Sequence, residues 1–213
     1  MRVILKTSPS YPVVPLRTSP YSLKFMRKQF FKIVWIIANA ITRPYIYIET
    51  SEGKEAKNMI KTRFLKAAIH LYKFHYKNMK NNGDLFFIGK SYQALDDHSK
   101  ALEYFKKVWE TAAYSPVCFK EIGTECLILE NYEEALSFAL KEVSQFPGQA
   151  ESRAHLALVL TYLKRVDAAY EEIQRARSMG ESPYVMNIFN LISDIKSGKK
   201  PIPERLGTGG KLP

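Results

Sequence analysis

Hydrophobic residues recur at helical spacing through the second half of the chain. Ile88, Tyr92 and Leu95 fall at i, i+4 and i+7, which places them on one face of a helix. A second stripe of this kind consists of Ala101, Leu102, Phe105 and Val108. A short polar link separates the two stripes, so this part of the chain predicts two helices that pack as a pair.

The pattern repeats with a period of 34 residues. Small or apolar residues recur at this spacing at two places in the pattern: Gly89, Gly123, Ala157 and Leu191, and then Ala101, Ala135 and Ala169. A fixed period of this length indicates a repeat architecture. Glycine inside a helix costs about 1 kcal/mol of helix propensity. We therefore expect Gly89 and Gly123 to allow close packing of each first helix against the second helix of its pair.

The 213-residue chain has an ordinary globular composition, but its charge is divided unevenly. Apolar residues make up 46% and charged residues 25%, which excludes wholesale disorder. Residues 1–82 carry a net charge of +13, residues 83–198 a net charge of −5, and residues 199–213 a net charge of +3. A basic front therefore precedes an acidic body, as in proteins whose basic arm meets an acidic surface.

The front segment, residues 1–54, allows several interpretations. Its early prolines predict extended chain, and the apolar stretch 30–42 is too short to span a bilayer. It can be an amphipathic helix packed on the repeats, an acid-poor targeting sequence over residues 1–48, or a nucleic-acid contact. It can also be an interfacial helix that touches a membrane or another acidic surface. The residues of that contact would include Arg27, Lys28, Phe30, Phe31, Lys32 and Trp35.

Residues 55–78 predict one long helix that covers the open end of the repeats. Terminal units of repeat proteins are atypical, and Asn81, Asn82 and Gly83 end this helix. The helix mixes basic and aromatic residues, a composition that can contact phosphates and stack bases. The acidic body that follows argues against a nucleic-acid groove.

The sequence offers no recognisable catalytic, cofactor or metal site. Cys118 and Cys126 are eight residues apart, about 12 Å along one helix, so we expect buried free thiols and no disulfide between them. His70 and His75 do not converge on one helix face, and His155 is expected at the surface or in a groove. No phosphate-binding loop, zinc spacing or nucleophile elbow occurs. We expect a protein that is not an enzyme and has no cofactor.

In three consecutive units the sequence resembles the tetratricopeptide repeat (TPR) family. The matching positions are Leu85, Ile88, Gly89, Tyr92, Ala101, Phe105 and Val108 in 82–115; Phe119, Ile122, Gly123, Cys126, Ala135, Ala139 and Pro147 in 116–149; and Arg153, Leu156, Ala157, Leu160, Ala169, Ile173, Ala176 and Pro183 in 150–183. The resemblance implies an all-α, short right-handed α-solenoid of about three helix-pair repeats with a capping helix over 184–197. The chain then divides into a basic N-terminal segment, extended or helical (1–54), a long helix that is a degenerate repeat or N-cap (55–82), the repeats with their cap (83–197) and a flexible tail (198–213).

The resemblance further implies a concave groove that binds a peptide or helix of a partner protein. The groove residues would be Phe86, Lys90, Gln93, Lys120, Thr124, Leu127, Ala154, Leu158 and Thr161. Lys90 and Lys120 could orient an acidic group of the ligand. Glu121 and Glu151 would repel the carboxylate that chaperone-binding members hold, so we disfavour that use.

We therefore expect a protein-interaction adaptor, scaffold or assembly factor whose basic front can hold it at a membrane. The alternative is an accessory or regulatory subunit of an enzyme complex that contacts nucleic acid through the basic front. Self-association through the stacking ends is a further expectation. The expected location is the cytoplasm, with or without membrane attachment, or an organelle resembling the mitochondrion if residues 1–48 are a transit peptide.

Overall fold

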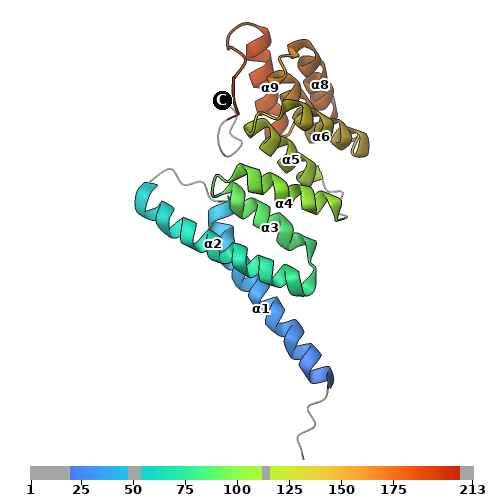
Figure 1. The fold of residues 1–213 in the computed structure, drawn as a ribbon. Helices are drawn as coiled ribbons and strands as arrows, with labels where there is room; N and C mark the ends of the chain where they lie inside the picture. Colours follow the sequence, from blue (N-terminus) through green and yellow to red (C-terminus); the bar gives the residue numbers. More distant parts are fainter. Residues whose placement is uncertain (1–19, 48–53, 112–115, 207–213) are drawn as a thin grey trace, which may run out of the picture.

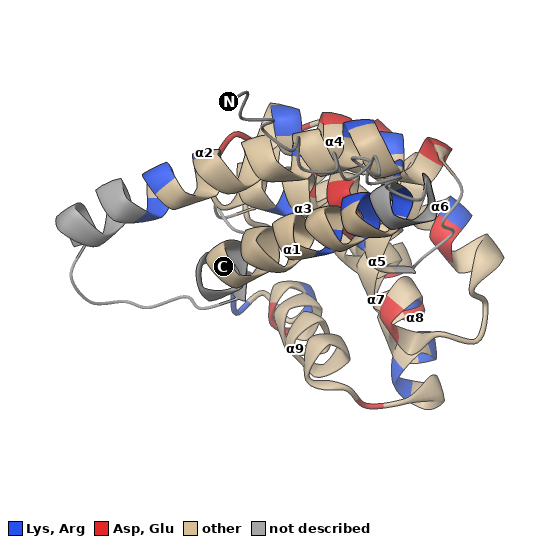
Figure 2. Cartoon of the chain, turned by 90° about the horizontal axis from the view of Figure 1, so that it is seen from below, with Lys and Arg blue, Asp and Glu red and all other residues tan. Residues whose placement is uncertain are grey.

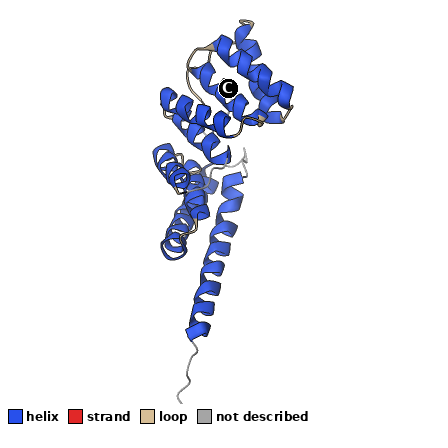
Figure 3. Cartoon of the chain, turned by 90° about the vertical axis from the view of Figure 1, so that its right-hand side faces the viewer, coloured by secondary structure: helices blue, strands red, loops and turns tan. Residues whose placement is uncertain are grey.

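The computed structural model describes residues 20–47, 54–111 and 116–206, and every regular element among them is an α-helix (Figure 3). The helices are α1 (Pro20–Tyr47), α2 (Lys54–Met79), α3 (Asn82–Gln93), α4 (His98–Glu110), α5 (Pro116–Ile128), α6 (Tyr132–Gln145), α7 (Ala150–Tyr162), α8 (Val166–Met179) and α9 (Pro183–Lys196). The predicted extended start (residues 1–19), which is the first part of the suggested targeting sequence, and the last seven residues lie outside the described residues.

The three helix pairs α3–α4, α5–α6 and α7–α8 stack in chain order into an α-solenoid (Figure 1). The predicted all-α solenoid is therefore confirmed. The turns inside the pairs are alike, because Asp96, Glu130 and Lys164 each have a positive φ near 60°. They are again 34 residues apart. The next residue's N–H donates to a carbonyl five residues earlier, for example Asn131 to Cys126 at 2.8 Å, which satisfies the end of the first helix.

The mid-helix glycines allow close contacts, as predicted, but with different neighbours. A Cβ atom at Gly89 would lie 2.6 Å from the ring of Phe105, which belongs to the second helix of the same pair. A Cβ atom at Gly123 would lie 2.3 Å from the ring of His155. His155 belongs to α7, the first helix of the following pair. Gly123 thus serves the stacking of units, and the expectation that it packs against its own second helix is wrong.

A buried histidine–carboxylate pair joins the helices at each of three successive boundaries between units. His75 Nδ1 lies 2.6 Å from Asp84 Oδ2, between α2 and α3. The other pairs are His98–Glu125 at 2.8 Å, between α4 and α5, and His155–Glu142 at 2.6 Å, between α7 and α6. His155 is completely buried, so its expected place at the surface or in a groove is wrong. His155 lies in the contact between α6 and α7, because Glu142 of the preceding unit pairs with it there.

The two ends of the solenoid are covered differently. At the C-terminal end α9 packs on α7 and α8, and Ser182 caps α9 by accepting a hydrogen bond from the Val185 N–H. Beyond α9 the chain turns back, so that Leu206 is buried and the Tyr132 hydroxyl donates to the Glu204 carbonyl at 3.2 Å. Within the segment predicted as a tail, Ile202 and Leu206 therefore pack against the solenoid core. At the other end α2 packs on α3, and α1 packs on α2 but runs well past the solenoid (Figures 1 and 3).

The Gly123 contact predicts a selective loss of stability. Gly123→Ala should lower the free energy of unfolding by about 1–3 kcal/mol, because the new methyl group forces His155 out of its place. Denaturant unfolding measures this, with Gly148→Ala as the control, since a Cβ atom at Gly148 meets nothing within 4 Å. Equal stability of Gly123→Ala and the wild type would contradict the contact.

The pair between His98 and Glu125 predicts a pH dependence of stability. Burial raises the pKa of Glu125, and the hydrogen bond from His98 offsets this only partly. The folded state therefore holds this proton more tightly than the unfolded state, and the contribution of Glu125 falls as the pH rises from about 4.5 through the raised pKa. The stability of the wild type relative to Glu125→Gln should decrease over this rise. Glu110→Gln, the same change at an exposed position at the end of α4, is the matched control.

Candidate functional site

The predicted groove residues lie on α3, α5 and α7, the first helices of the three pairs, but much of the surface they would form is closed. Four of them, Leu127, Ala154, Leu158 and Thr161, are buried. The Thr161 hydroxyl donates to the carbonyl of Ala157 at 2.8 Å within its own helix. The other five, Phe86, Lys90, Gln93, Lys120 and Thr124, are half-buried. Only the part of the groove between α3 and α5 therefore has predicted contact residues open to solvent.

The two lysines predicted to orient an acidic ligand are engaged inside the chain. Lys90 Nζ forms an ion pair with Glu121 at 3.1 Å and a hydrogen bond with Gln93. Gln93 Nε2 donates to Glu121 at 3.0 Å and to Glu125 at 2.5 Å. An acidic ligand at Lys90 would have to displace Glu121, a carboxylate that sequence reasoning had counted as repelling such a ligand.

Lys120 is held by an aromatic ring from a helix two units away. Its Nζ lies 3.8 Å from the ring centroid of Tyr184, the second residue of α9. This contact reaches from α5 to α9 across α7, which accounts for part of the closure of the groove. Burial, together with the nearby carboxylate of Glu142, raises the pKa of Tyr184, so its hydroxyl stays neutral.

The residues predicted to touch a membrane or acidic surface divide between the two sides of α1. Phe31 is buried, with its ring 5.6 Å from that of Phe74, and Trp35 is half-buried against the small core formed by α1, α2 and α3. These two face inward, because α2 covers that side. Phe30 is exposed, as are the basic residues Arg27, Lys28 and Lys32.

A continuous apolar stripe on α1 remains uncovered. It is formed by Met26, Phe30, Ile33 and Ile37, which are 67, 53, 54 and 46% exposed. They fall at i, i+4, i+7 and i+11, on one face of the helix. Sequence reasoning named Phe30 but missed Met26 and Ile37, although the same spacing could have found them. No described helix is both long enough and apolar enough to cross a membrane.

Among the described residues, the two cysteines lie in the protein core. Burial raises the pKa of Cys118 to about 11 and that of Cys126 to about 12, so both thiols stay protonated at neutral pH. No three His, Cys, Asp or Glu side chains come together as a metal site within the part of the chain that is described. Both cysteines are buried and unpaired, as the sequence predicted.

Comparisons with known proteins show similarity in fold. No protein-family model matches this sequence, and no curated protein is detectably similar to it. A double mutant of MamA (RS-1 ArsTM) superposes with a TM-score of 0.57 and 15% identity, over 80% of this chain and 96% of that one. MamA from residue 41 to its end, from Desulfovibrio magneticus RS-1, gives 0.51 and 15%, over 70% and 99% of the two chains.

The third similar structure is YrrB, described as a TPR protein with an unusual peptide-binding site. It gives a TM-score of 0.51 and 17% identity, over 79% of this chain and 90% of that one. These similarities agree with the 34-residue period, the three helix pairs and their common turns. The described helices therefore form a TPR-like solenoid, and this protein is TPR-like in fold.

Proposed function

We propose that this protein is a non-catalytic adaptor that binds a partner protein on its solenoid and lies against an anionic membrane surface through α1. The observation that carries the membrane part is the uncovered apolar stripe of α1 beside a basic edge. The fold supports the partner-binding part, because a stack of helix pairs presents an extended surface for recognition.

The chemistry of α1 suits a helix that lies in a membrane interface. One face, with Phe31, Val34 and Ala38, is buried against the rest of the protein. The uncovered apolar stripe, about 100° around the helix from this face, would sit at the boundary of headgroups and acyl chains. Lys28 and Lys32, farther round the helix, would add positive charge close to the phosphates. Figure 2 shows basic segments along α1, and the sequence of this helix contains no Asp or Glu to repel an anionic surface.

Partner binding is proposed for the open part of the groove between α3 and α5. Phe86, Lys120 and Thr124 retain partial exposure there, and Val117 at the start of α5 is 51% exposed. A peptide or helix with apolar side chains could cover Phe86 and Val117. YrrB, with this type of fold, is described by its peptide-binding site, which supports a peptide ligand for this chain as well.

Membrane binding is tested by cosedimentation with vesicles that contain phosphatidylserine. The full-length protein should bind them, and the double variant Ile33→Asp, Ile37→Asp should lose at least about tenfold in partitioning, because two exposed apolar side chains that would enter the membrane are replaced by charges. The matched control is Leu140→Asp, which changes a similarly exposed residue on α6 and should bind as the wild type does. Absence of wild-type binding, or equal losses in both variants, would overturn the membrane role.

Partner binding is tested by affinity purification from native cells with mass spectrometry. Thr124→Arg should remove the specific partners, because a long cation would occupy the open part of the groove. The double variant on α1 should retain those partners after detergent extraction. If Thr124→Arg recovers the same proteins as the wild type, the proposed contact surface is wrong.

A further inference from the structure

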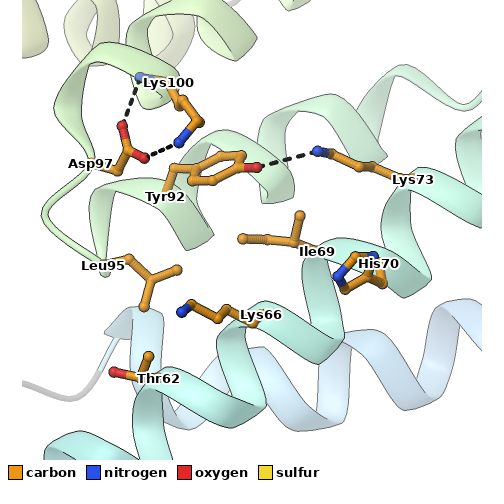
Figure 4. Close-up of a pocket in the computed structure, with 9 residues that line it drawn as sticks. All are labelled: Thr62, Lys66, Ile69, His70, Lys73, Tyr92, Leu95, Asp97 and Lys100. Atoms are coloured by element: carbon orange, nitrogen blue, oxygen red, sulfur yellow. Dashed lines mark hydrogen bonds and ion pairs between the residues drawn. The ribbon is translucent and has the colours of Figure 1, made fainter.

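A basic cavity lies between α2 and the turn that joins α3 to α4, away from the groove and from α1. Its volume is about 480 Å³, within the range of sites that hold small ligands or side chains of a peptide. Lys66, His70 and Lys73 line it from α2, Tyr92 and Leu95 from the end of α3 and the turn, and Lys100 from α4. Figure 4 shows Lys66 and Lys73 extending from α2 toward the turn.

The positive charge of this cavity is only partly compensated. Asp97 is the only carboxylate that lines it, and both of its oxygens are turned to Lys100, whose Nζ lies 2.5 Å away and whose N–H lies 3.2 Å away (Figure 4). The Lys100 hydrogen bond lowers the pKa of Asp97, which keeps the carboxylate ionised and committed to that contact. Among the described residues no hydrogen bond or ion pair holds Lys66 or His70. The lining thus has an excess of positive charge.

Lys73 is exposed, but contacts with two tyrosines hold its side chain in position. Its Nζ lies 3.2 Å from the Tyr92 hydroxyl and 5.5 Å from the ring centroids of both Tyr92 and Tyr104. Burial lowers the pKa of Lys73, but its hydrogen bonds with the two tyrosines outweigh this and raise it overall. Lys73 is therefore a pre-positioned cation beside an apolar floor made by Ile69 and Leu95.

The basic character continues along α2 beyond the cavity. Arg63, Lys66, His70, Lys73 and Lys77 are spaced by three or four residues, so they share one face of the helix, and all are exposed. The stripe is about 21 Å long at 1.5 Å per residue. No Asp or Glu occurs between residues 56 and 83. An extended chain of about six residues, at about 3.4 Å each, would match this length.

These features favour an acidic peptide over nucleic acid or a membrane. Tyr104 stacks on Tyr92, and Lys73 and Lys100 also lie over the Tyr92 ring, so this ring is not free to stack on a base. A cavity admits a protruding side chain, which the flat surface of a bilayer does not offer.

We propose that the cavity and the basic stripe of α2 bind an acidic, extended segment of a partner protein. Lys66 and Lys73 meet carboxylates of the segment, and one apolar side chain enters the cavity against Ile69 and Leu95. This site is separate from the groove and from α1. Its test is therefore independent of the tests of the function proposed above.

Fluorescence anisotropy of the full-length protein with three labelled probes tests the site. The first probe is a hexapeptide of Glu and Asp with one central Leu, the second is its Gln and Asn counterpart, and the third is single-stranded DNA of equal charge. The acidic peptide should bind most tightly, and binding should weaken as salt increases. Equal binding of the first two peptides, or tighter binding of DNA, would overturn the proposal.

A pair of matched variants locates the binding. Lys66→Glu should weaken binding of the acidic peptide about tenfold or more, whereas Lys199→Glu makes the same charge change at an exposed position after α9 and should change it less than about twofold. Circular dichroism and the unfolding midpoint check that both variants fold. Similar affinities for the two variants would show that the peptide responds to net charge alone and would refute the site.

Discussion

Each helix pair of this solenoid has an apolar side that a neighbouring element must cover. The arrangement of the other helices follows from this requirement. Inside the array the next pair provides the cover, with the ring of His155 packed directly on Gly123. At the C-terminal end α9 and the returning segment with Leu206 provide it. At the N-terminal end α2 covers α3, and α1 in turn covers α2. Because α1 has two apolar faces, one remains exposed after the array is complete.

The same stacking explains why the predicted groove is largely closed. The resemblance to TPR proteins implied that Leu158 and Thr161 would face a ligand in the groove. Here Leu158 and Thr161 are buried, and Lys120 reaches Tyr184 across α7. On α3, Lys90 forms a hydrogen bond with Glu121, and Gln93 forms one with Glu125. The exposed apolar and basic side chains that could bind a partner therefore lie mostly outside the middle of the groove, on α1, on α2 and between α3 and α5.

The buried histidine–carboxylate pairs combine two effects on stability. Burial raises the pKa of Asp84 and of Glu125, so each carboxylate costs free energy when it is charged and needs its histidine nearby. In return, each pair is directional and joins one unit to the next in a fixed register. Removing one member would leave its partner buried without compensation, which is commonly worse than replacing both.

The repeated helix pairs follow from the amino-acid sequence alone. The period of 34 residues, the small residues at Gly89 and Ala101 and the stripe of Ile88, Tyr92 and Leu95 are local or periodic signals, and they were sufficient for the solenoid and for two free buried thiols. Which faces of the helices are covered depends on contacts between units. His155 is buried because Glu142 arrives from another unit, Lys90 is paired because Glu121 lies 31 residues away in sequence, and Phe31 turns inward while Phe30 does not. These outcomes depend on how neighbouring units are positioned, and periodicity within one unit does not specify that position.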